Sequence, residues 1–176
     1  LTFTNITVAD AADYTVVATN TVGSVTSSPA SLSVTSSGTT SRLSNVSVRT
    51  TLTAEQILTV GLTMQGGVKP VLIRAAGPGL AAFGVPGTMA DPRLALFNGP
   101  TQEATNDNWN GNTAVANGIA RVGAFPFPST SSLDAALMRP INGGRTVQVS
   151  GPSAGNLIVE AYDAGAGTSP DRKSTR

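Results

Sequence analysis

Side chains that carry oxygen gather at one place in the second half of the sequence. Asn106, Asp107 and Asn108 are consecutive, and Asp91 lies shortly upstream. Ca²⁺ takes several oxygen ligands from carboxylates, amide carbonyls and backbone. The spacing does not match an EF-hand loop, and Asx residues are also common in turns because they bond to nearby backbone. The four residues are a candidate calcium site, with a plain polar turn as the alternative.

Trp109 and Asn110 follow this group directly. An exposed indole on a loop can stack on a sugar ring, whereas a buried indole belongs to the hydrophobic core. We name Trp109 and Asn110 as candidate carbohydrate-binding residues, with core packing of Trp109 as the alternative.

Most other catalytic chemistry is excluded by composition. The chain has no His and no Cys, so a Ser-His-Asp triad, a thiol nucleophile and a His- or Cys-ligated zinc site are impossible within it. A glycosidase needs two carboxyl groups about 5–10 Å apart. The carboxylates that could pair lie at strand ends or turns, where acidic residues are ordinary: Asp91, Asp107, Asp134, Glu160 and Asp163. We expect no enzyme activity, and no cofactor other than the candidate Ca²⁺.

The charge and hydroxyl content limit the partners. The 176 residues include 11 Lys or Arg and 10 Asp or Glu, whereas Ser and Thr together number 40. Scattered cations and a net charge of +1 argue against nucleic acid as a partner. No apolar run approaches the ~18 residues that span a bilayer, so we expect no membrane insertion.

From Arg42 onward the pattern predicts an all-β domain. Turn dipeptides bound several of its strands at Asn98-Gly99, Asn110-Gly111 and Asn142-Gly143. Residues 71–73 and 157–159 are apolar runs typical of strands buried on both faces. The predicted strands are 43–53, 56–64, 70–75, 94–97, 133–138, 146–150 and 157–162, while 113–122 has the spacing of a short helix, with a loop as the alternative. Seven strands with polar turns predict a β-sandwich or jelly roll.

The first 34 residues carry a more specific pattern. Asp10, Ala12 and Tyr14 are spaced as Asp-x-Ala-x-Tyr, and Asn20 and Gly23 mark a turn further on. This segment resembles the C-terminal half of an immunoglobulin I-set domain, strands E to G. The resemblance implies that Tyr14 is a tyrosine corner, with a buried ring and a hydroxyl bonded to nearby backbone, and that Asp10 is structural. Strands A to D would come from upstream or from another chain.

The domain from Arg42 carries a second resemblance, through residues 41–49, 69–78, 91–97 and 106–109. It resembles a module repeated in large secreted proteins of Verrucomicrobia, and its second half is similar to bacterial pre-peptidase C-terminal domains. The resemblance implies an extracellular or cell-surface location.

These patterns predict four segments. They are a partial immunoglobulin-like sheet (1–35), a linker (36–41), a β-sandwich module (42–165), and a linker or the start of a further repeat (166–176). The last prediction rests on a Ser/Thr-rich stretch leading into Arg, which precedes both Arg42 and Arg176. We expect a piece of a longer exported protein.

The favoured function is a structural or adhesive module of a bacterial surface protein. Its partners would be neighbouring copies of itself or adjacent domains, and strand completion between chains could build a fibre. The alternative is a Ca²⁺-assisted domain that holds polysaccharide near a secreted hydrolase.

Overall fold

The computed structural model describes residues 6–34 and 44–165, which belong to two units. One unit spans Leu1–Arg42 and the other Leu43–Arg176, so the division lies next to the predicted linker. The linker itself, the predicted tail 166–176 and the first five residues of the predicted immunoglobulin-like segment lie outside the described residues.

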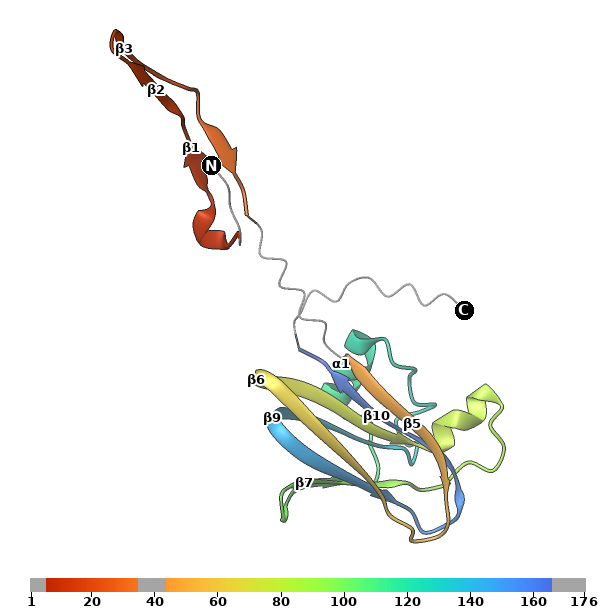
Figure 1. The fold of residues 1–176 in the computed structure, drawn as a ribbon. Helices are drawn as coiled ribbons and strands as arrows, with labels where there is room; N and C mark the ends of the chain where they lie inside the picture. The colour runs from red at the N-terminus through yellow and green to blue at the C-terminus, as the bar shows by residue number, and fades with distance from the viewer. Residues whose placement is uncertain (1–5, 35–43, 166–176) are drawn as a thin grey trace. The chain divides into compact units, whose positions relative to one another are not determined.

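The first unit is a long, narrow antiparallel ribbon (Figure 1). The turn at its tip, residues 21–22, is stabilised by Asn20. The Asn20 side-chain oxygen accepts the backbone N–H groups of Val22 and Gly23 at 2.8 and 3.1 Å. The turn prediction at Asn20 and Gly23 is therefore confirmed. The elements are η1 (Val8–Asp10), β1 (Ala12–Tyr14), β2 (Val17–Asn20), β3 (Gly23–Thr26) and β4 (Ala30–Leu32), with β1 paired to β4 and β2 to β3.

The second unit is built on one six-stranded antiparallel sheet with the order β5-β10-β6-β9-β7-β8. Two of its strands are much longer than the sequence predicts, since each joins two predicted strands. The elements are β5 (Asn45–Leu52), β6 (Leu58–Ala76), η2 (Pro78–Phe83), β7 (Arg93–Asn98), β8 (Thr101–Asn106), α1 (Thr113–Val122), β9 (Ala135–Ser150) and β10 (Gly155–Asp163).

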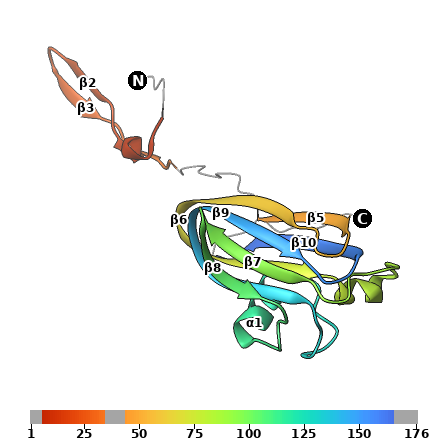
Figure 2. The same ribbon diagram turned by 90° about the horizontal axis from the view of Figure 1, so that it is seen from below.

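The sheet bends where β6 and β9 change register. The pairing shifts between Met64 and Lys69, and Gly66 and Gly67 adopt φ of +80° and +101° there. Such positive φ values are accessible to glycine at little cost. The Asn142-Gly143 dipeptide lies opposite this bulge, inside β9, so its prediction as a turn between strands is wrong. Figure 2 shows β6 curving around this end of the unit.

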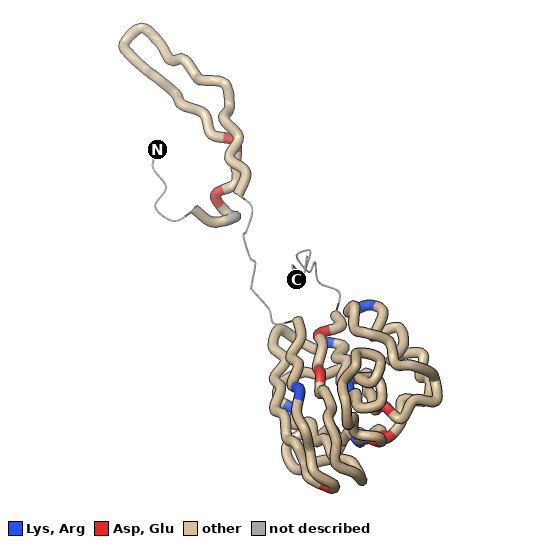
Figure 3. The backbone as a smooth tube through the Cα atoms, turned by 90° about the vertical axis from the view of Figure 1, so that its right-hand side faces the viewer, with Lys and Arg blue, Asp and Glu red and all other residues tan. Residues whose placement is uncertain are grey.

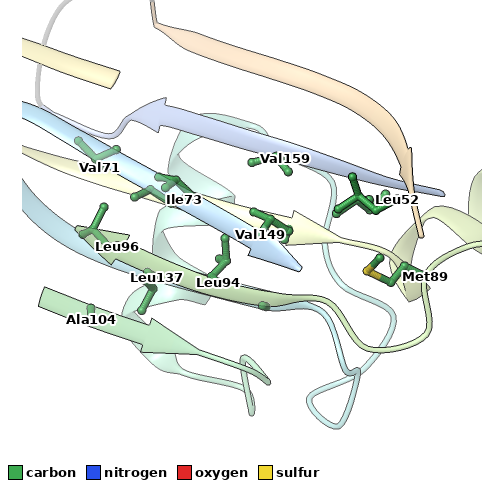
Figure 4. Close-up of a cluster of buried hydrophobic side chains, with 14 of the residues drawn as sticks. Leu52, Val71, Ile73, Met89, Leu94, Leu96, Ala104, Leu137, Val149 and Val159 are labelled. Atoms are coloured by element: carbon green, nitrogen blue, oxygen red, sulfur yellow. The ribbon is translucent and has the colours of Figure 1, made fainter. Parts of the chain in front are cut away.

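The bend folds the sheet over its larger hydrophobic core, in the sandwich-like arrangement that the sequence predicts. Leu58, Val60 and Leu62 from one half of β6 pack against the same cluster as Val71 and Ile73 from the other half. Figure 4 shows buried side chains of this cluster converging from several strands, among them Leu94, Leu96, Val149 and Val159. The all-β class is therefore confirmed.

A helix and a loop cover the outer face of one half of the sheet. Val115 and Ile119 of α1 pack with Leu72, Ala76 and other residues in a second hydrophobic cluster. The sheet segments at residues 71–73 therefore have cores on both faces, and Val71, Leu72 and Ile73 are all fully buried, as predicted. The helix prediction at 113–122 is also confirmed.

The start of α1 depends on a side-chain cap. Asn112 accepts the N–H of Val115 through its side-chain oxygen at 3.1 Å. Asn112→Ala is expected to lower the free energy of unfolding by about 1 kcal/mol, because one helix N–H loses its partner. Asn117→Ala is the matched control: Asn117 is exposed in the middle of the same helix, and alanine there raises helix propensity. Urea unfolding followed by Trp109 fluorescence measures both, and equal effects would contradict the cap.

Candidate functional site

The predicted calcium ligands hold the ends of strands together. Asn106, the last residue of β8, accepts the N–H of Ala136 at 2.8 Å and donates to the carbonyl oxygen of Asn108 at 2.9 Å. Both polar ends of its amide are therefore used within the protein. This is the bonding that the alternative interpretation, a polar turn, requires.

Asp91 and Asp107 face a guanidinium group. The Nε of Arg93 lies 3.1 Å from a carboxylate oxygen of Asp107, and its Nη2 lies 4.0 Å from a carboxylate oxygen of Asp91. The other carboxylate oxygen of Asp91 and the side-chain oxygen of Asn108 are buried without a hydrogen-bond donor. Within residues 6–34 and 44–165, no three acidic side chains gather as a metal site. The calcium site stays a prediction, in which the cation would compete with Arg93.

Trp109 belongs to the core. Its side chain is 8% exposed, its Nε1 donates to the carbonyl oxygen of Ser129 at 3.0 Å, and its ring centroid lies 5.3 Å from that of Phe127. The prediction of an exposed stacking platform is therefore wrong, and the packing alternative is confirmed. Asn110 is exposed in the turn before α1, with φ of +48°.

A pocket lies beside these residues, on the outer face of the bent sheet. Its volume is about 310 Å³, and Arg93, Asn106 and Asp107 line one side of it. The remaining lining residues are Ile57, Leu94, Ala95, Thr105, Gln148 and Ser150. Two of the predicted calcium ligands, Asn106 and Asp107, therefore lie next to a cavity that the sequence does not predict.

A buried ion pair lies under the loop that follows α1. Arg74 is fully buried, and its Nε lies 2.9 Å from a carboxylate oxygen of Glu160. Its Nη1 donates to the carbonyl oxygen of Phe125 at 2.6 Å, and the guanidinium lies 4.0 Å from the centre of the Phe125 ring. Arg74 therefore fastens the loop to the sheet through charge, a hydrogen bond and a cation–π contact.

The surroundings of this pair explain two altered pKa values. Burial lowers the pKa of Arg74, and the nearby charge of Glu160 opposes that shift. Burial and the hydrogen bond from its hydroxyl to Glu160, 2.8 Å long, raise the pKa of Tyr162 to about 12. Because the folded-state pKa of Tyr162 lies above its ordinary value, its contribution to stability is complete below pH 10. That contribution is lost as the pH rises toward 12.

Asp134 holds the loop that leads into η2. Its carboxylate is fully buried and accepts the N–H groups of Gly77 and Gly79 at 2.8 and 3.0 Å, together with the hydroxyl of Ser132. From the sequence alone, Asp134 is an ordinary acidic residue at a strand end. Here it satisfies two buried N–H groups of the Gly77-Pro78-Gly79 loop.

A sequence signal for the buried pair does exist. Arg74 follows the apolar run 71–73 directly, and Glu160 follows the run 157–159 directly. Charged residues are almost never fully buried unless they are paired. Two opposite charges, each continuing a strand predicted to be buried on both faces, therefore indicate an internal ion pair.

In the first unit, the Tyr14 hydroxyl donates to the carbonyl oxygen of Asp10 at 2.8 Å. This is the bond to nearby backbone that the tyrosine-corner pattern implies, although the Tyr14 side chain is only half-buried. The Asp10 carboxylate accepts the N–H and the hydroxyl of Thr7 at 2.8 and 2.9 Å. These bonds lower the pKa of Asp10.

In the described ranges, no helix has the length and apolar character needed to cross a membrane. Comparisons with protein-family models, with curated proteins and with solved structures give no match for this chain.

Proposed function

We propose that the chain is a structural or adhesive module of an exported bacterial surface protein, and that strands from another chain complete its N-terminal ribbon. The role is one of assembly and not of catalysis. The observation that carries the proposal is the lack of a core in the ribbon. Between residues 6 and 34, none of the side chains that the structure describes is buried.

The ribbon is amphipathic, which explains what a completing strand would cover. Paired residues lie on the same face of an antiparallel ladder, and faces alternate along each strand. The pairing of Ala12 with Leu32 therefore places apolar side chains together on one face of the β1–β4 ladder, and the pairing of Ala18 with Val25 does the same in the β2–β3 ladder. Val16 extends the β2–β3 ladder, because its carbonyl oxygen accepts the N–H of Ser27, so it lies on the same face as Ala18. Val16 is 71% exposed, and Val25 is 74% exposed.

The opposite face is rich in hydroxyl groups. It carries Thr19, Ser24, Thr26 and Ser31, with Val17 among them as the partner of Thr26, together with Asp13, one of the two acidic residues between residues 6 and 34 (Figure 3). A two-stranded ribbon is marginally stable in water unless further strands or a second layer cover its apolar face. An added layer over Val16 and Val25 would supply the missing core while leaving the hydroxyl-rich face in solvent.

The native size of the purified chain tests the proposal. Light scattering with negative-stain imaging is expected to show assemblies much larger than the 17.7 kDa chain. Val16→Ser combined with Val25→Ser is expected to dissolve them, because both changes remove apolar surface from the contact. Val22→Ser is the matched control, since Val22 lies in the turn at the tip and is 93% exposed. A monomer at all concentrations, or equal effects of the two variants, would overturn the proposal.

The second candidate function is carbohydrate binding. The observation that favours it is the pocket that Asn106 and Asp107 line. The buried position of Trp109 removes the stacking ring from that candidate, so binding would depend on the polar side chains of the pocket.

A further inference from the structure

The pocket lies on the outer face of the sheet, over the first residues of β7 and the last residues of β8 and β9. Ala95 pairs with Thr105 of β8 and with Gln148 of β9, and Arg93 pairs with Ser150. Their neighbours Leu94, Leu96, Val147 and Val149 point into the core, so these paired residues point outward. Because the side chain of Ala95 is smaller than those of its neighbours, the surface is hollowed at this position. Its volume of about 310 Å³ lies at the lower end of the range for small-ligand pockets, about 300–1,000 Å³.

The pocket offers hydrogen-bonding groups that are not engaged elsewhere. Thr105, Gln148 and Ser150 contribute two hydroxyls and one amide, all of which both donate and accept. Among the described residues, none forms a hydrogen bond or ion pair with these three side chains. A ligand that displaces water from the pocket can therefore bond to them without breaking contacts inside the protein.

The charges select against ions. The Arg93 guanidinium lies between Asp107, at 3.1 Å, and Asp91, at 4.0 Å. An anion would have to displace these carboxylates from Arg93, and a cation would meet the guanidinium itself. Neutral hydroxyl groups avoid both penalties, because each can donate to Asp107 and accept from Arg93 while the ion pair stays in place.

The pocket also has an apolar wall. Ile57 lines it and is 57% exposed, and Ala95 lies at its centre. A sugar ring combines a face of C–H groups with an equatorial belt of hydroxyls, so it matches an aliphatic wall next to polar side chains. We infer that this pocket binds one residue of a neutral carbohydrate, through Thr105, Gln148, Ser150 and the Arg93–Asp107 pair. The inference deepens the second candidate function and is independent of the assembly proposed above.

Titration calorimetry with the full chain tests this assignment, using cellotetraose, xylotetraose and mannotetraose as probes and tetragalacturonate as the anionic comparison. At least one neutral probe is expected to bind, and Gln148→Ala is expected to weaken it about tenfold, which corresponds to about 1.4 kcal/mol for the lost hydrogen bonds. Gln102→Ala is the matched control. Gln102 is exposed on β8 and pairs with Phe97, away from the pocket, and its replacement is expected to leave the affinity unchanged.

Each other outcome overturns a separate part of the inference. No binding of any neutral probe would overturn both the pocket assignment and the second candidate function, but not the assembly. Binding that Gln148→Ala leaves unchanged, in a variant whose Trp109 fluorescence shows the same unfolding curve, would place the sugar elsewhere on the chain. Tighter binding of tetragalacturonate than of the neutral probes would overturn the inference that the ligand is neutral.

Discussion

Arg74→Met is expected to lower the free energy of unfolding of the second unit by about 3–5 kcal/mol, because it leaves the carboxylate of Glu160 buried without its partner. Glu160 is 5% exposed and Arg74 is fully buried, so water cannot replace the lost charge. The variant also loses the hydrogen bond to the Phe125 carbonyl. Trp109 is the only tryptophan of the chain and lies in the adjoining cluster, so urea unfolding followed by its fluorescence reports on this unit.

Two further variants test whether the broken ion pair causes the loss of stability in Arg74→Met. Arg139→Met makes the same change at an exposed position of β9, and it is expected to change stability by less than about 0.5 kcal/mol. Arg74→Met combined with Glu160→Leu removes both charges, and is expected to recover much of the loss because no buried charge is left unpaired. Equal stability of Arg74→Met and Arg139→Met would contradict the ion pair as a major contributor.

Gly155→Ala is expected to destabilise the same unit by about 3–4 kcal/mol, through overpacking and lost hydrogen bonds. A Cβ at residue 155 would lie 2.4 Å from the backbone N and Cα of Met89. To make room, the segment around Met89 would have to move away from β10. That movement would break the hydrogen bond from the Met89 N–H to the Asn156 carbonyl, 2.8 Å long, and would withdraw a fully buried side chain from the core.

Gly61→Ala is the matched control for this prediction. Gly61 also lies within a strand, β6, but a Cβ there would meet nothing within 4 Å. Its replacement is expected to be neutral or slightly stabilising, within about 0.5–1 kcal/mol, because alanine restricts the unfolded chain. The same unfolding experiment compares the two variants. If Gly155→Ala unfolds at the same urea concentration as Gly61→Ala, the close approach to Met89 does not constrain the fold.

The all-β class and the buried strands could be predicted because their residues follow simple periodic rules. Residues 71–73 and 157–159 are apolar without alternation, and both lie between two cores. The strand β8 is not predictable in this way, because in Thr101–Asn106 only Ala104 is buried, which leaves no hydrophobic pattern to detect. The sequence predicts two strands in place of β6, and two in place of β9, because the glycines at the bend have the sequence of a turn. Only the pairing of the two strands keeps the chain extended there.

The candidate site was predicted less well, for a different physical reason. Asn106 and Asp107 do lie beside a pocket, since polar residues at a strand end remain near the surface. Whether Trp109 is exposed or buried depends on Phe127 and Ser129, which approach it only after the loop beyond α1 has folded back. Gln148 and Ser150 come from another strand altogether, and their place in the pocket follows from strand order, which local sequence does not encode.

The chain enters and leaves the second unit at adjacent points. Asn45 pairs with Tyr162, and the N–H of Asp163 donates to the carbonyl oxygen of Ser44 at 2.9 Å. Tension applied through these two points would open the β5–β10 ladder one pair at a time from its end, and would not load all its hydrogen bonds in parallel. The folded unit adds only about one strand spacing, roughly 5 Å, between those points. The same residues fully extended span on the order of 400 Å. Under load, the unit would therefore unfold at low force and lengthen the chain, and it would refold when the load is removed.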